Sequence, residues 1–310
     1  MTPDLVVTIF VAGLAIGTTF VFAAVGEIIA ERSGVLNLGV EGMMLVGAVT
    51  GFLVNGQVEA PWIGAVAAIA AGAAMGLMHA AFVVGFKTNQ VVTGLALVIF
   101  GSGLSGYLGN SVVGQPPPAT FNRVAIPGLS SIPVLGRILF NQDVLVYAGF
   151  VLAVAAWWLL FKTRPGINLR SVGESPETAD AVGISVTATR YVAVMCGGGF
   201  AGLAGAHLSL AQAPSWVPNM TAGRGWIAIA LVIFATWNPI RAALGGYLFG
   251  CLEALTFRLQ AVGFDISPFF VSMLPYLFTI VVLVVIARGK LNQRLAAPAA
   301  LGTTFTREER

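Results

Sequence analysis

Apolar stretches as long as a lipid bilayer is thick dominate this sequence. A helix that crosses a bilayer needs about 20 mostly apolar residues. Stretches of this kind lie at residues 5–25, 35–54, 62–86, 90–108, 144–161, 191–212, 225–236, 240–257 and 269–287. Only 9% of the 310 residues are charged and 57% are hydrophobic, which leaves too few polar side chains to cover a water-soluble globule. The sequence therefore predicts an all-α, multi-pass membrane protein with about nine spans.

Two of these stretches, 225–236 and 240–257, are too short to cross a bilayer of full thickness. Trp237, Asn238 and Pro239 separate them, and a proline ends or kinks a helix. Interrupted or re-entrant helices are common where membrane transporters bind their cargo. A pair of half-helices is therefore one alternative for these stretches and a pair of spans is the other, and the exact number of spans depends on which of them forms.

Basic residues set the expected orientation, because they gather on the cytoplasmic side of a membrane. They are concentrated in a loop at 162–190 and in a tail at 288–310. Placing both in the cytoplasm puts the N-terminus outside, together with the segments 109–143 and 213–224. We expect one membrane domain over residues 1–290, which includes the cytoplasmic loop 162–190, followed by a cytoplasmic tail over 291–310.

The cytoplasmic loop contains the pattern of a short capped helix. Ser175 can accept a hydrogen bond from the first helical turn, and Pro176 has the fixed φ angle that suits the first helical position. Gly183 supplies the residue at which helices commonly stop. We expect a helix over 176–182, placed where a partner outside the membrane can touch it. A solvated loop with an incidental helix is the alternative.

Polar side chains near the start of two apolar stretches are candidates for a transport pathway. Such groups are costly inside a membrane and mark either a pathway or a buried structural bond. Asn37 and Glu41 are four residues apart, which would place them on one helical face. Asn89 and Gln90 begin the fourth stretch. Glu41 could line the pathway or hold a local bend, and both interpretations remain open.

Two further polar positions occur in the second half of the chain. Glu253 lies in the eighth stretch and could pair with Arg241 or Arg258. Arg224 and Trp226 stand where the seventh stretch begins. Pathway lining and a satisfied interhelical bond are again both open.

Enzymatic and metal-binding functions find no support in the sequence. The GxxxxGK[ST] phosphate-binding loop does not occur, so we do not expect this chain to hydrolyse ATP. His79 and His207 are isolated, and no HExxH pattern indicates a metal site. Cys196 and Cys251 stand singly within apolar stretches and are interpreted as packing residues. The net charge of +3 is too small to indicate a nucleic-acid partner.

Three segments carry a resemblance to a known family. They are Glu31-Arg-Ser-Gly-Val-Leu-Asn-Leu-Gly-Val-Glu-Gly-Met43, Asn89-Gln-Val-Val-Thr-Gly-Leu-Ala-Leu97, and the stretch from Gly166 to Gly183 followed by Gly202-Leu-Ala-Gly205. Together they resemble the permease subunits of bacterial ABC importers for branched-chain amino acids, ribose-type sugars and nucleosides. The first two segments are most similar to the nucleoside permeases. The resemblance covers roughly residues 10–290.

The resemblance implies a function for the short helix near 176–182. In this family it is the coupling helix, which rests in a groove of a separate ATPase and passes the closure of that ATPase to the membrane spans. The matching positions are Arg170, Gly173, Glu174, Pro176, Ala179 and Gly183. ATP and magnesium would be used by the ATPase, and this chain would need no cofactor. An extracytoplasmic binding protein and a second, different permease would complete the importer in the bacterial cytoplasmic membrane.

A nucleoside would need aromatic surfaces for its base and polar groups for its ribose. Candidates for this pathway are Asn37, Glu41, Asn89, Gln90, Phe100, Trp226 and Phe234. A simple sugar or a branched-chain amino acid is the alternative cargo. A secondary transporter driven by an ion gradient is the alternative mechanism, but it would leave the capped helix at 176–182 unexplained.

Overall fold

The computed structural model describes residues 3–261, 267, 270, 273, 277, 280, 281, 284 and 297–306. Most of the ninth predicted stretch, 269–287, lies outside these residues. The described helices are α1 (Pro3–Glu31), α2 (Val40–Val58), α3 (Pro61–Ala80), α4 (Gln90–Gly109), α5 (Leu135–Leu139), α6 (Val144–Lys162), α7 (Arg164–Glu174), α8 (Pro176–Ala181), α9 (Val186–His207), α10 (Arg224–Phe234) and α11 (Pro239–Ala261). Helical turns η1 (Ala81–Gly85), η2 (Asn110–Val112) and η3 (Leu208–Gln212) extend α3, α4 and α9.

Six of the described helices are long and apolar enough to cross a membrane. They are Leu5–Glu31, Pro61–Gly85, Gln90–Val112, Val144–Lys162, Val186–Gln212 and Pro239–Ala261. The prediction of a helical membrane protein is confirmed at this level, and the count of nine spans is not. The interpretation of 240–257 as too short to cross was wrong, because α11 has 23 residues, whereas α10 has only 11.

Glycines let the long helices pack with their backbones almost touching. A side chain built on Gly202 of α9 would fall on the carbonyl oxygen of Ala68 in α3, and one on Gly72 of α3 would fall on the carbonyl oxygen of Gly198. Helix α1 crosses α11 in the same way, because a side chain on Gly250 would fall on the carbonyl oxygen of Gly13. Small residues serve this purpose in membranes, where lipid provides no hydrophobic drive for helix association.

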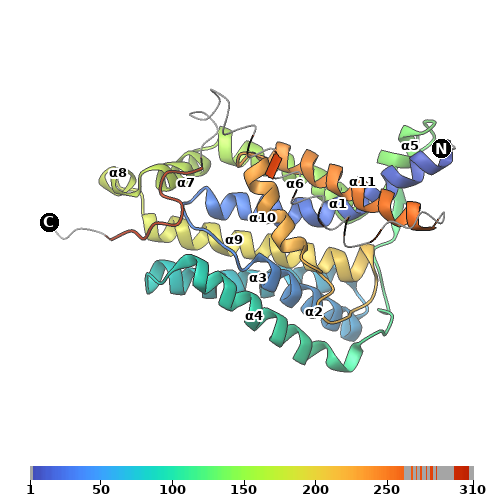
Figure 1. Ribbon diagram of the computed structural model, residues 1–310, viewed down its shortest axis with the longest axis horizontal. Helices are drawn as coiled ribbons and strands as arrows, with labels where there is room; N and C mark the ends of the chain where they lie inside the picture. The colour runs from blue at the N-terminus through green and yellow to red at the C-terminus, as the bar shows by residue number, and fades with distance from the viewer. Residues whose placement is uncertain are drawn as a thin grey trace.

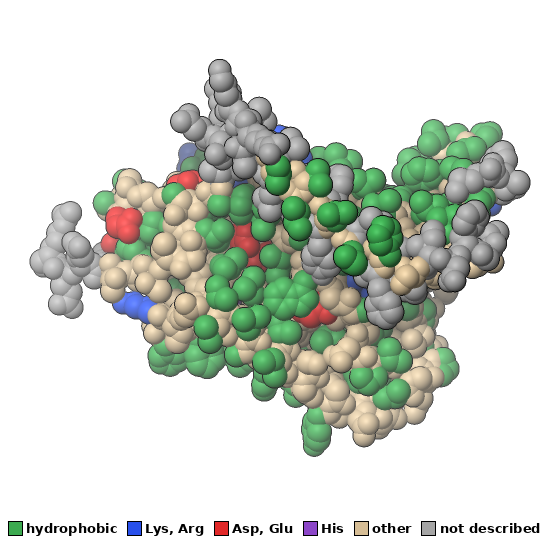
Figure 2. Space-filling view, viewed as in Figure 1, with side chains coloured by type: hydrophobic (Ala, Val, Ile, Leu, Met, Phe, Trp, Pro, Cys, Tyr) green, Lys and Arg blue, Asp and Glu red, His purple; other side chains and the backbone are tan. Residues whose placement is uncertain are grey.

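The two ends of the bundle differ in character. Helices α7 and α8 and the C-terminal segment lie at one end, whereas α5 and the N-terminus lie at the other (Figure 1). The opposite end also holds a two-stranded antiparallel ribbon of β1 (Arg123–Ala125) and β2 (Asn141–Asp143), in which Arg123 pairs with Asp143. Figure 2 shows a face made mostly of hydrophobic side chains, other uncharged side chains and backbone, with acidic side chains both at the α7–α8 end and near the middle of the face.

The C-terminal segment 297–306 is tied to the α7–α8 end by hydrogen bonds. The amide of Ala300 donates to the carbonyl of Gly173 at 2.9 Å, and the amide of Gly302 donates to the carbonyl of Gly34 at 3.2 Å. The carbonyl of Thr303 accepts from the side chain of Arg190 at 3.2 Å. The described part of the tail is therefore a strap that joins α7, α9 and the turn after α1.

Candidate functional site

The short helix of the basic loop forms as its sequence indicates. Helix α8 begins at Pro176, and the hydroxyl of Ser175 accepts a hydrogen bond from the amide of Thr178 at 3.4 Å. It ends at Ala181, one residue before the expected end. Gly183 follows with a φ angle of 86°, a left-handed conformation that suits glycine. The predicted cap, start and stop are thus confirmed.

Helix α7, which leads into α8, was not expected. Its hydrophobic side is narrow: Gly166, Leu169, Val172 and Gly173 are buried, whereas the rest of the helix is exposed or half-buried. This spacing of three and four residues is the signal of an amphipathic helix. The hydroxyl of Thr163 caps the start by accepting from the amide of Gly166 at 3.3 Å.

The predicted coupling positions on α8 face into the chain, whereas other residues form the outward face of this helix. Pro176 and Ala179 are buried, and Ala179 packs with Val172, Val186 and Phe305. The outward face of α8 and its end is formed instead by Glu177, Thr178, Ala181 and Val182. The sequence analysis did not identify these exposed residues, because the positions that match the family motif on α8 are the ones that hold the helix in place.

Gly173 lies inside the chain. A side chain built there would fall on the carbonyl oxygen of Arg32, in the turn after α1. The adjacent Glu174 is half exposed, lies 4.0 Å from the guanidinium of Arg32, and accepts from the amide of Ala299 at 3.3 Å. The absence of a side chain at position 173 is thus explained by packing within this protein.

Arg170 also turns towards its own chain. Its Nε donates to the carbonyl of Leu160 at 3.0 Å, and its guanidinium lies 5.0 Å from the centre of the Phe161 ring. These contacts fasten α7 to the end of α6.

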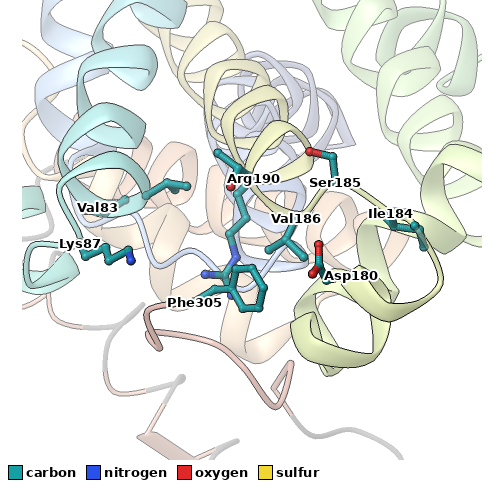
Figure 3. Close-up of a pocket in the computed structure, with 11 residues that line it drawn as sticks. Val83, Lys87, Asp180, Ile184, Ser185, Val186, Arg190 and Phe305 are labelled. Carbon is teal, nitrogen blue, oxygen red and sulfur yellow. The ribbon is translucent and has the colours of Figure 1, made fainter. Parts of the chain in front are cut away.

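A cavity of about 380 Å³ lies beside α8 (Figure 3). Asp180 from α8, Arg190 from α9, Lys87 from the α3–α4 turn and Phe305 from the C-terminal segment line it. The end of η1 and the residues that follow α8 complete its walls. The cavity thus lies where α8, α9, the α3–α4 turn and the C-terminal segment come together.

Glu41 is a structural anchor for α10. One carboxylate oxygen accepts from the hydroxyl of Thr221 at 2.6 Å and from the amide of Gly223 at 2.8 Å. The other accepts from the amide of Gly225 at 2.6 Å. A carboxylate at a helix start satisfies free amides and suits the positive end of the helix dipole. Thr221 is fully buried, so part of the segment 213–224 lies inside the bundle rather than on the outer face as expected.

Asn37 does not share a helical face with Glu41, because α2 begins only at Val40. Its side chain is fully buried, and the side-chain oxygen accepts from the backbone amide of Gly39 at 3.1 Å. The backbone amide of Asn37 donates to the carboxylate of Glu27 at 3.1 Å. Residues 35–37 have no regular secondary structure, so the helix of the predicted stretch 35–54 begins only at Val40. Asn37 thus shapes the connection between α1 and α2.

Asn89 and Gln90 both serve the start of α4. The side chain of Asn89 caps the helix by accepting from the amide of Val92 at 3.1 Å. The side chain of Gln90 accepts from the amide of Leu36 at 2.7 Å, and His79 bonds the carbonyl of Leu36 at 3.1 Å. The amide and the carbonyl of Leu36, in the segment before α2, are therefore both held by side chains of neighbouring helices, at the α8 end of the bundle.

Glu253 pairs with Arg224, and the expectation of Arg241 or Arg258 was wrong. The carboxylate of Glu253 and the guanidinium of Arg224 are 2.6 Å apart. The guanidinium also donates to the carbonyl of Met220 at 3.3 Å. This ion pair joins the start of α10 to α11, two elements that the Trp237 turn connects at their other ends.

The three aromatic candidates lie on two helices. Phe100 is on α4 with 49% of its surface exposed. Trp226 and Phe234 are half-buried on α10, and Phe234 packs beside Gly245 of α11. The structure thus places two of the three on the half-helix that Glu41 anchors.

Two buried polar clusters were missed. Glu27 and Glu31 of α1 are almost fully buried four residues apart, and Glu31 accepts a short hydrogen bond from the indole of Trp237. His207 of α9 bonds the hydroxyl of Thr19 at 2.8 Å and lies 3.9 Å from the carboxylate of Asp143. Carboxylates spaced at four residues within an apolar stretch were the available signal for the first cluster.

The comparisons with known proteins agree on the family, while the relatives are named for different cargoes. Residues 9–287 match the model of the family described as "Branched-chain amino acid transport system / permease component". TsgC13 from Haloferax volcanii, named as a glucose ABC transporter permease, is 41% identical over 94% of this chain and 95% of its own. The guanosine ABC transporter permease NupQ from Bacillus subtilis is 36% identical over 96% of both chains. The nucleoside ABC transporter permease NupC from Lactococcus lactis is 34% identical over 97% of this chain and 98% of its own. No solved structure gave a significant match.

Proposed function

We propose that this chain, which belongs to the family of permease components typified by branched-chain amino acid transport systems, carries nucleosides. It is a multi-pass permease subunit of an ABC importer. The observation that supports a nucleoside cargo is the similarity along nearly the whole chain to permeases named for guanosine and for nucleosides. The Arg32-to-Gly42 and Asn89-to-Val92 segments, most similar to the nucleoside branch, point to the same cargo.

Glucose is the second candidate cargo, because the relative with 41% identity is named for it. A nucleoside and a hexose both present a ring with several hydroxyl groups, and they differ in the flat base. Aromatic side chains near the pathway would favour the nucleoside. Trp226 and Phe234, both on the half-helix α10, are our candidates for that contact, with Phe100 as a further one on α4.

Glu41, Asn37, Asn89 and Gln90 have a different place in this proposal. Each of these side chains is engaged in a hydrogen bond within the chain. We propose that they fix the elements that border the pathway, namely α2, α4 and α10. Cargo would then contact the faces of these elements that the second permease completes.

We further propose that α8 is the contact with the partner ATPase and that the α8 end lies in the cytoplasm. The importer would contain two such ATPases, a second and different permease and an extracytoplasmic binding protein. The capped helix, its exposed outward face and its connections to α7, α9 and the tail support a role in transmitting force.

Cargo is tested by the ATPase rate of the complete importer in nanodiscs. We expect guanosine and other nucleosides, added with the binding protein, to raise the rate several-fold above that of the complex without cargo. Glucose and leucine should leave the rate unchanged. Stimulation by glucose alone would contradict the nucleoside proposal and support the second candidate. Stimulation by leucine alone would contradict both.

A further inference from the structure

An apolar groove of about 610 Å³ opens between α1, α6, α7 and α9, on the side of α9 that faces α6. This volume lies in the range of binding sites for small ligands, about 300–1,000 Å³. Its walls are aliphatic and aromatic, with Asn168 and Thr189 as the polar side chains among them. The main lining residues are Ile29, Leu152, Leu159, Leu169, Val192 and Phe200.

The groove lies on the surface that would face lipid. Its rim includes Leu159, 40% exposed, and Val192, 61% exposed. Helix α7 closes the groove at the α8 end through Pro165, Asn168 and Leu169. A slot that runs along two membrane helices and is closed at one end has the form of a site for an extended apolar chain.

Basic side chains stand at the closed end. Leu152, Ala155 and Leu159 line the groove from α6, and Lys162 continues the same helical stripe one turn farther. Arg164 follows at the start of α7, and both basic side chains are exposed. The Lys162 ammonium lies 5.8 Å from the centre of the ring of Trp157, which does not line the groove, and the flexible lysine side chain can turn from there to the end of the groove. Basic side chains next to an apolar groove match the headgroup region of a bilayer.

We propose that this groove binds one anionic phospholipid, with an acyl chain along α6 and α9 and the phosphate at Lys162 and Arg164. Burial of the acyl chain supplies affinity, and the two basic side chains select the negative headgroup. The exposed amide of Asn168 lies at the same closed end, where it can donate to a phosphate or ester oxygen. The ligand thereby fills the space beneath α7.

A lipid in this position would affect coupling. Helix α7 connects α6 to α8, and its buried side faces both the groove, through Leu169, and the turn after α1, through Gly173. A filled groove would support α7 on the side that faces α9, in addition to the bonds that fasten α7 to the end of α6. An empty groove would leave α7 with less support towards α9, so ATP hydrolysis would become less tightly linked to uptake.

The test is native mass spectrometry of the purified complex exchanged into phosphatidylglycerol or phosphatidylcholine. We expect the wild type to retain one phosphatidylglycerol in preference to phosphatidylcholine. The double variant Lys162→Gln with Arg164→Gln should bind phosphatidylglycerol about tenfold or more weakly than the wild type. Each basic side chain near an anionic surface contributes about fivefold in affinity. Ala155→Phe, which fills the groove from an exposed position, should remove the bound lipid. Val154→Phe, on the neighbouring exposed position outside the groove, is the matched control and should bind as the wild type does.

Three results would overturn the proposal. Equal retention of both lipids would show that the lipid adheres to the protein surface without preference for its headgroup. Unchanged phosphatidylglycerol retention in Ala155→Phe would place the bound lipid elsewhere. Loss of the lipid when the second permease joins the complex would assign the groove to a protein interface instead.

Discussion

Glu41→Ala is expected to prevent the permease from reaching its folded state in the membrane. The substitution leaves the hydroxyl of Thr221 and the amides of Gly223 and Gly225 without their acceptor, inside the bundle. Hydrogen bonds to a charged group contribute about 1.5–3 kcal/mol each, so we expect a loss of about 4 kcal/mol or more. That is a large part of the stability of a typical protein, about 5–15 kcal/mol. Membrane yield and thermal stability in detergent measure the effect.

Glu41→Gln distinguishes a structural role from a direct role in transport. Glutamine keeps one acceptor oxygen but turns an amide donor towards the donors at the start of α10. We therefore expect reduced yield and a lowered melting temperature in this variant as well. Glu59→Gln, on an exposed residue after α2, is the control and should match the wild type. Normal stability of Glu41→Gln with loss of uptake alone would assign Glu41 to the cargo pathway.

Gly202→Leu is expected to abolish folding altogether. A side chain at position 202 would fall on the carbonyl oxygen of Ala68 and lie 3.1 Å from the Cα of Gly72, and a side chain on Gly47 of α2 would meet Gly202 in turn. Three helices, α2, α3 and α9, therefore cross at this point with no space between them. Backbone cannot yield as a flexible side chain can, so the helices would have to separate.

Gly103→Leu is the matched control for this prediction. Gly103 lies in α4, and a side chain built there meets no atom within 4 Å. Leucine favours a helix over glycine by about 0.8–1 kcal/mol, so this variant should be as stable as the wild type or slightly more so. Fluorescence-detected size-exclusion profiles of both variants are the measurement. A monodisperse peak of normal height for Gly202→Leu would contradict the close packing described above.

Local signals in the sequence were reliable guides to local structure. Ser175, Pro176 and Gly183 indicated α8 because a cap, a start and a stop depend on residues within one helical turn. The same kind of reasoning could have found α7, whose buried residues repeat at helical spacing. It was missed because a short amphipathic helix has low overall hydrophobicity and does not appear in a search for apolar stretches.

Partnerships between distant residues could not be predicted. Glu41 bonds Thr221, which is 180 residues away, and Arg224 pairs with Glu253 across the turn between α10 and α11. The basic residues on the same apolar stretch, Arg241 and Arg258, were therefore the wrong candidates for the partner of Glu253. The stretch that forms α11 looked too short in the sequence, because Arg241 and Arg258 stand at the two ends of its most apolar part. The helix nevertheless runs from Pro239 to Ala261, since an ionic residue can lie in a span when it has a partner.

The family resemblance predicted a coupling region but did not indicate which of its side chains a partner could contact. Gly173, Pro176 and Ala179 are buried, and Arg170 and Glu174 bind their own chain. These residues position α8. The surface that a partner could touch is formed by other side chains, among which Val182 has 71% of its surface exposed.

The central claim, that the outward face of α8 couples an ATPase to transport, is tested most directly with Val182→Trp. The site is exposed, so the variant should give the size-exclusion profile of the wild type. We expect it to lose most of the copurifying ATPase and to abolish ATP-driven uptake into proteoliposomes. Val113→Trp, on an exposed residue at the opposite end of the bundle, should retain both. Wild-type ATPase retention together with wild-type uptake in Val182→Trp would contradict the account.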